Sequence, residues 1–143
     1  LLILVSTLGF GLIVKKFLNL NLFSNNYGFS GILGLFILSI FSSYSHLITA
    51  HNYYHNLFLI FVGIIFFIFC RGKNKNLIDL VIIFTIFFIA ILLSKNNEDF
   101  GYYHLPNSIQ FAQQKIQFGL GNLNHGFKHI SSLFMLISLN YLP

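Results

Sequence analysis

The chain has very few charged side chains. Of its 143 residues only 8% are charged, with three acidic residues against eight lysines and arginines. Soluble domains carry charge on roughly a quarter to a third of their surface, whereas 56% of this chain is hydrophobic. This composition excludes a soluble globular protein and predicts an integral membrane protein. The net charge of +5 is therefore interpreted through membrane topology, and no nucleic-acid partner is expected.

Several chemical signatures are also missing. The single cysteine, Cys70, cannot form a disulfide within the chain. The sequence contains no P-loop, dinucleotide fingerprint, cysteine-based metal motif or nucleophile elbow, so nothing points to the enzyme classes that use them. The chain begins with leucine and ends on an apolar run, and we expect it to be a fragment of a longer protein.

What the sequence has instead is a series of long apolar runs. A helix needs ~20 apolar residues to cross the hydrocarbon core of a bilayer. We therefore predict an all-α fold, a polytopic transmembrane helix bundle that forms a single domain. Ser30 and Gly34, at helical spacing in the second run, favour the close packing of a neighbouring helix within the bundle. The predicted spans cover residues 1–14, 28–47, 55–70, 77–93 and 130–143, of which the first and last are partial.

The basic residues predict the orientation of these spans. Two connections separated by two spans hold five of the eight basic residues, namely Lys15, Lys16, Arg71, Lys73 and Lys75. The positive-inside rule places both connections on the cytoplasmic side. Residues 94–129 would then face the periplasm or the exterior of a bacterial inner membrane. Within them, Pro106 followed by Asn107 and Ser108 predicts a capped helix start, and a helix over 107–118 would lie along the interface.

A short polar turn between the second and third spans contains three histidines. His51 and His55 are four residues apart, which on a helix would place two imidazoles on one side, as metal sites require. No neighbouring carboxylate or cysteine completes a ligand set, so no metal site is predicted there. The favoured interpretation is that these imidazoles and the adjacent tyrosines lie at the headgroup level of the membrane.

The outer segment, residues 94–129, concentrates the remaining polar chemistry. Glu98 and Asp99 follow an apolar run directly, and Tyr102, Tyr103 and His104 come next. A second polar stretch over 121–129 includes asparagines, histidines and a lysine. These residues fit two interpretations: an outer-face site, or solvated acids, interfacial tyrosines and turns that shape the return of the chain to the membrane.

Two motifs in this segment resemble those of a largely uncharacterised group of bacterial polytopic membrane proteins. The first motif is Glu-Asp-Phe-Gly-Tyr-Tyr-His-Leu-Pro over residues 98–106. The second is Gly-Asn-Leu-Asn-His-Gly-Phe-Lys over 121–128, followed by a Ser-Ser pair at the start of the last apolar run. That group is similar to GT-C glycosyltransferases, which use lipid-linked sugars. The resemblance covers about a third of the chain.

The resemblance implies a specific chemistry at the outer face of the membrane. An outer carboxylate would act as general base on an acceptor hydroxyl while a polyprenyl phosphate leaves its sugar. Asp99 is the candidate catalytic residue and Glu98 the second. The candidate substrate-binding residues supply cations, hydroxyls, amides or a stacking surface, and they are Tyr102, Tyr103, His104, Lys115, Asn122, Asn124, His125, Lys128 and His129.

The predicted partners are membrane lipid and a polyprenyl-phosphate sugar donor. A divalent cation is a candidate cofactor, without ligands assigned to it. Two other function classes stay open: a transporter component, and a non-catalytic membrane scaffold that presents the outer segment to a partner. The near absence of ionisable residues from the apolar runs speaks against a transport path through this part of the protein.

Overall fold

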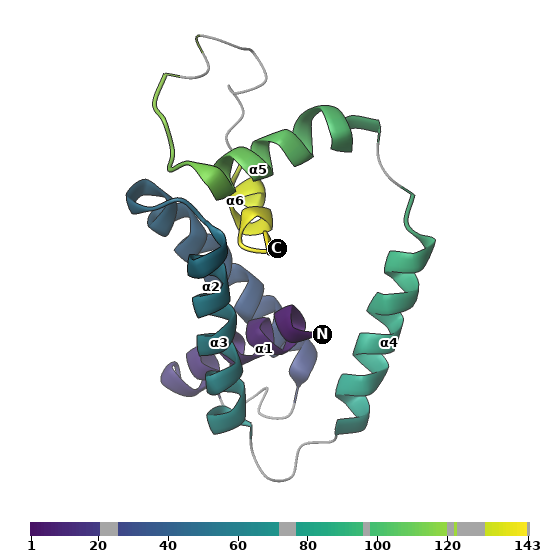
Figure 1. Ribbon diagram of the computed structural model, residues 1–143. Coiled ribbons are helices and arrows are strands. Elements are labelled where there is room, and N and C mark those ends of the chain that lie inside the picture. The colour runs from purple at the N-terminus through teal and green to yellow at the C-terminus, as the bar shows by residue number, and fades with distance from the viewer. Residues whose placement is uncertain (21–25, 72–76, 96–97, 120–121, 123–130, 143) are drawn as a thin grey trace. The chain divides into compact units, whose positions relative to one another are not determined.

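The structure is a computed structural model that describes residues 1–20, 26–71, 77–95, 98–119, 122 and 131–142. All regular structure within these residues is helical, which confirms the predicted all-α class for this part of the chain (Figure 1). The helices in chain order are α1 (Leu2–Phe17), α2 (Tyr27–Ile48), α3 (Tyr53–Cys70), α4 (Leu77–Leu93), the π-helix η2 (Phe100–His104), α5 (Leu105–Gln113) and α6 (Ser132–Ser138).

The three central helices lie close to the predicted spans. The second and fourth runs were predicted over 28–47 and 77–93, and α2 and α4 match them within one residue at each end. The third helix, α3, begins two residues before its predicted start at 55. Its first turn is capped by Asn52, whose Oδ1 accepts a hydrogen bond from the His55 N–H at 3.0 Å, which explains the earlier start.

The helices near the C-terminus differ from the prediction. The interfacial helix was expected over 107–118, but α5 ends at Gln113 and the backbone of Gln114 is extended. The expected span over 130–143 contains a helix of only seven residues, α6. The Asn56 side chain donates to the carbonyl oxygens of Ser138 and Tyr141, both at 2.9 Å, and so binds backbone acceptors that a longer helix would use internally.

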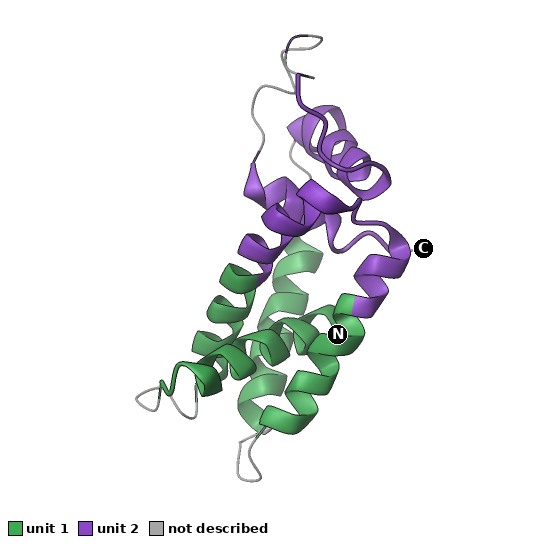
Figure 2. Ribbon diagram, turned by 90° about the vertical axis from the view of Figure 1, so that its left-hand side faces the viewer, with its two compact units in different colours: residues 1–37, 59–95 green, residues 38–58, 96–143 purple. Residues whose placement is uncertain are grey.

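The helices belong to two compact units, and α2 and α3 contribute to both (Figure 2). Unit 1 comprises residues 1–37 and 59–95, and unit 2 comprises residues 38–58 and 96–143. In unit 1 the small buried cluster of Leu12, Tyr27 and Phe67 brings together the last part of α1, the start of α2 and the end of α3.

Small residues allow α1 to pack closely on α2 in unit 1. A Cβ added to Gly34 would clash with the Thr7 carbonyl oxygen, and one added to Gly11 with that of Ser30. Because the residue numbers fall on α2 as they rise on α1, these two helices run antiparallel. The close approach of α1 at Ser30 and Gly34 confirms the packing role predicted for the small residues of α2.

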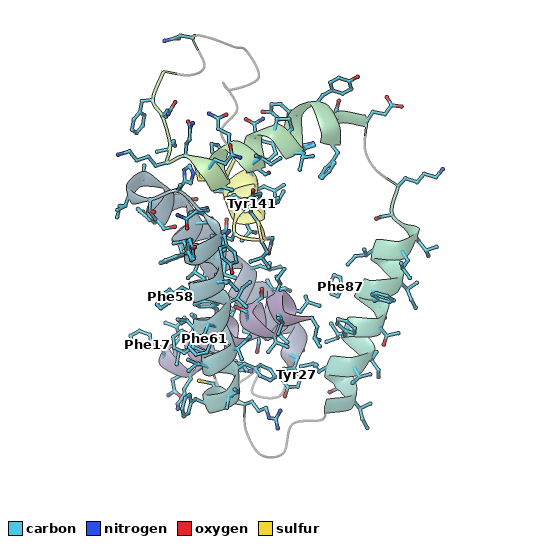
Figure 3. All side chains as sticks on the ribbon, viewed as in Figure 1. Phe17, Tyr27, Phe58, Phe61, Phe87 and Tyr141 are labelled. Carbon is cyan, nitrogen blue, oxygen red and sulfur yellow. The ribbon has the colours of Figure 1, made fainter. Side chains whose placement is uncertain are left out.

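Much of the exterior is apolar. Two helices, α2 and α3, are long and apolar enough to cross a membrane, with 22% and 28% of their apolar windows buried, respectively. Large side chains such as Phe58, Phe61 and Phe87 are 65%, 62% and 54% exposed (Figure 3). The two apolar helices indicate membrane association.

Candidate functional site

The candidate catalytic acids are exposed at the beginning of a continuous helical stretch in unit 2. Glu98 and Asp99 form its first residues, and the helix continues through η2 into α5 as far as Gln113. The turn after the acids is π-helical, because the N–H of Leu105 bonds to the carbonyl oxygen of Phe100. Tyr102 lies in this turn with its side chain 91% exposed, so its ring and hydroxyl are accessible close to the acids along the chain.

Two other predicted binding residues take part in packing. The rings of Tyr103 and His104 both lie 5.2 Å, centroid to centroid, from the ring of Phe134 in α6. Both side chains are half-buried, and Tyr103 packs against the cluster formed by Phe111, Phe134 and Met135. These contacts hold η2 and α5 against α6. They give Tyr103 and His104 a structural role that the sequence did not indicate.

The predicted cap at the start of the interfacial helix is wrong. Pro106 lies in the first turn of α5 as predicted, but the residue before the helix is His104, and Asn107 and Ser108 are buried as its third and fourth residues. The Asn107 amide donates to the carbonyl oxygen of Tyr103 at 2.7 Å, and the Ser108 hydroxyl donates to that of His104 at 2.8 Å. Pro106 lacks an N–H, so the backbone ladder is interrupted here and side chains supply additional donors to the preceding turn.

The remaining predicted binding residues are not gathered at the acids by the described part of the chain. Lys115 is exposed beyond the end of α5, and Asn122 is exposed as well. The other four predicted binding residues, Asn124, His125, Lys128 and His129, lie outside the described residues. The described candidate site therefore consists of Glu98, Asp99 and Tyr102.

Unit 2 also contains a buried polar centre that the sequence did not predict. We call His46, His51 and His55 the histidine cluster. The rings of His46 and His51 are 4.7 Å apart in a T-shaped arrangement, and those of His51 and His55 are stacked at 5.0 Å. His46 and His51 are completely buried, which corrects the interpretation that these imidazoles lie at the headgroup level.

Hydrogen bonds from the cluster reach both α5 and α6. His46 lies in the last turn of α2, and its Nε2 is 2.9 Å from the carbonyl oxygen of Phe111. A carbonyl oxygen can only accept, so this nitrogen carries the proton. The backbone N–H of His51 donates to the same oxygen at 3.1 Å. In return, the N–H of Ile116 donates to the carbonyl oxygen of His46 at 3.3 Å.

The position of the proton on His51 follows from its neighbours. The Ser138 hydroxyl donates to the carbonyl oxygen of Met135 at 2.7 Å, so its oxygen accepts from Nδ1 of His51, also at 2.7 Å. Nε2 of His51 lies 2.9 Å from the Ser45 hydroxyl, whose single proton can point to this nitrogen or to the carbonyl oxygen of Ser42 at 3.3 Å. A neutral imidazole fits these partners, with Nδ1 donating to Ser138 and Nε2 accepting from Ser45. Burial, followed by the positive charge that His46 and His55 can carry, lowers the pKa of His51 to about 3.

The Ser45–His51–Ser138 arrangement resembles a nucleophile with its base and an orienting group, but its electrostatics do not suit catalysis. A serine nucleophile needs a base that accepts a proton near neutral pH and a group that stabilises the resulting imidazolium. The group behind His51 is the Ser138 hydroxyl rather than a carboxylate, and the pKa of about 3 makes the imidazole a poor base. We therefore assign this arrangement a structural role.

The histidines do not form a metal site with other described residues. No group of three histidine, cysteine, aspartate or glutamate side chains is placed to hold an ion in the described ranges. His51 precedes the first residue of α3, so the helical spacing expected for His51 and His55 does not apply. Their rings are stacked, and their Nδ1 atoms have different partners, Ser138 Oγ and Asn56 Oδ1.

Asn56 completes the polar centre. Its side chain is fully buried, and its Nδ2 lies 2.8 Å from the carbonyl oxygen of His51 and 2.9 Å from those of Ser138 and Tyr141. Its Oδ1 is 3.2 Å from Nδ1 of His55. One side chain thus connects the start of α3, the preceding connection and the chain just beyond α6.

One signal in the sequence could have suggested this centre. His46, His51 and Asn56 lie at the facing ends of two apolar runs joined by a short connection, a place where polar side chains can turn inward together. The sequence could not show that the partner of His46 is Phe111, 65 residues away, or that the partner of His51 is Ser138, 87 residues away.

Comparisons of this chain with known protein families, with curated proteins and with solved structures found no match.

Proposed function

We propose that this chain is part of a glycosyltransferase-like enzyme that works at the outer face of a bacterial inner membrane. Its donor would be a sugar linked to a polyprenyl phosphate. The observation that carries the proposal is the exposure of Glu98 and Asp99 directly before a turn whose Tyr102 is also exposed. An accessible carboxylate next to an accessible aromatic ring is a suitable start for binding and activating a carbohydrate hydroxyl.

The proposed reaction needs one proton acceptor from this chain. Asp99 takes the proton of the acceptor hydroxyl as its oxygen forms a bond to the anomeric carbon of the sugar. The bond between that carbon and the phosphate oxygen breaks, and polyprenyl phosphate leaves as an anion. Tyr102 offers a stacking surface for the sugar, and cationic or N–H donors for the leaving phosphate have to come from outside the described candidate site.

The first prediction concerns topology. With Cys70 replaced by serine, a single cysteine at Tyr102 in the full-length protein should react with a membrane-impermeant thiol reagent in intact cells, because residues 94–129 are proposed to face outward. The control is a single cysteine at Lys16, an exposed residue in the last turn of α1. It should react only after the membrane is opened. Labelling of Tyr102→Cys only in opened cells would reject the outer-face enzyme and favour a transporter or a scaffold.

The second prediction concerns the general base. Asp99→Asn should lower the transfer of radiolabelled sugar from polyprenyl-phosphate hexoses to membrane acceptors by about 10²- to 10⁴-fold, because the amide cannot take a proton. The measurement uses membranes that contain equal amounts of full-length protein. Asp79→Asn, which changes the acid in the first turn of α4, is the matched control and should transfer at the wild-type rate. Equal transfer by both variants would remove Asp99 from the mechanism.

A further inference from the structure

The histidine cluster connects the ends of α2 and α3 with α5 and α6. Through its ring nitrogens it reaches the end of α2 at Ser45, α5 at Phe111 and α6 at Ser138. Two phenylalanines extend the ring contacts: Phe41 stacks on His55 with a centroid distance of 6.3 Å, and Phe111 meets His46 edge to face at 4.8 Å. Separation of α5 or α6 from α2 and α3 would therefore break contacts of this cluster.

The groups that face His51 leave no counter-charge for a proton. From α2 it is faced by His46 and from α3 by His55, which are themselves bases. The described residues of α5 and α6 contain no ionisable side chain. The described acids of unit 2, Glu98 and Asp99, are exposed at the far end of the helical stretch that continues into α5, and only His46 and His55 act on His51 through their charge. The remaining described titratable side chains near α5 and α6 are Tyr103, His104, Lys115 and Tyr141.

We propose that the histidine cluster is an acid-sensitive latch, in which protonation of His51 releases α5 and α6 from the facing ends of α2 and α3. A protonated His51 would place a full charge in a position with no exposure to solvent, between two other imidazoles that offer no counter-charge. The open form, with the imidazole in water, has no such penalty. This inference is independent of the proposed glycosyltransferase activity.

The direction of the pH effect follows from the two protonation states. His51 has a pKa of about 3 in the closed form, against about 6.5 for a histidine in water. Above pH 6.5 both forms are neutral and the latch keeps its full stability. As the pH falls from 6.5 towards 3, only the open form binds the proton, so opening becomes more favourable. For one such proton, the opening equilibrium should increase about 25-fold between pH 7 and pH 5.

Hydrogen–deuterium exchange of the full-length protein in lipid nanodiscs tests this prediction at pH 7 and pH 5, with exchange times corrected for intrinsic rates. The reporters are peptides with the amides of His51 and Ile116, which donate to the carbonyl oxygens of Phe111 and His46. Their protection should fall about 25-fold or more at pH 5. Peptides of α1, which contains no histidine, should keep their protection.

A variant identifies the responsible proton. His51→Asn keeps an N–H donor towards Ser138 but cannot be protonated, so the pH dependence of the reporter peptides should be about 25-fold smaller than in the wild type. If this variant does not fold at pH 7, His51→Gln, which keeps an acceptor for Ser45, replaces it. The latch is rejected by unchanged protection of the wild type at pH 5, by an equal loss in α1, or by a folded variant that keeps the full pH dependence.

Discussion

Replacement of Asn56 by alanine is expected to destabilise unit 2 by about 3–5 kcal/mol. The two N–H groups of the Asn56 amide are shared among three carbonyl oxygens, of His51, Ser138 and Tyr141, in a position with no exposure to solvent. Each buried polar group left without its partner costs ~1–3 kcal/mol. Alanine removes the donors to all three acceptors at once and leaves space that the surrounding backbone has to fill.

The measurement is denaturant unfolding of the full-length protein in detergent micelles, followed by far-ultraviolet circular dichroism. Asn52→Ala is the matched control, because it removes the same side chain four residues earlier. Asn52 is exposed and caps α3 through one hydrogen bond to the His55 N–H. Losing such a cap costs about 1 kcal/mol. If the two variants unfold at the same denaturant concentration, Asn56 does not stabilise unit 2 through its hydrogen bonds to the carbonyl oxygens of Ser138 and Tyr141.

The difference between these two asparagines shows how far the sequence could predict this fold. The lengths of the apolar runs predicted α2, α3 and α4 closely, because these helices depend on local hydrophobicity and on polar residues at their ends. The short length of α6 was not predictable. Its end at Ser138 coincides with a hydrogen bond from Asn56, 82 residues earlier, and an apolar run alone gives no sign of such a distant donor.

The candidate site was only partly predictable for a similar reason. The sequence suggested that Glu98 and Asp99 follow an apolar helix, and the structure shows both exposed. It treated Tyr102, Tyr103 and His104 alike, whereas a π-helical turn leaves Tyr102 exposed and packs the other two against Phe134. Three adjacent residues therefore have different environments, because the π-helical turn directs Tyr102 to the exterior and Phe134 in α6 packs against Tyr103 and His104.

The packing of α1 on α3 leads to the second large expected effect. The α-carbon of Gly9 lies so close to α3 that a Cβ there would meet the carbonyl oxygen of Gly63 and the backbone nitrogen of Phe67. Backbone atoms of a helix cannot move aside individually, so Gly9→Ala must separate the two helices. We expect a loss of about 3 kcal/mol or more in the unfolding free energy of unit 1, at the upper end of overpacking effects.

Gly31→Ala in α2 is the matched control for this prediction. A Cβ at Gly31 would lie 3.6 Å from Cδ2 of Leu8, an ordinary van der Waals contact. Alanine is also the better helix former by up to about 1 kcal/mol, so this variant should be as stable as the wild type or slightly more stable. The same unfolding measurement compares the two. Both changes add one methyl group to a glycine in an apolar helix. A lower stability of Gly9→Ala alone would therefore support the close contact between α1 and α3. Equal stability of the two variants would contradict that contact.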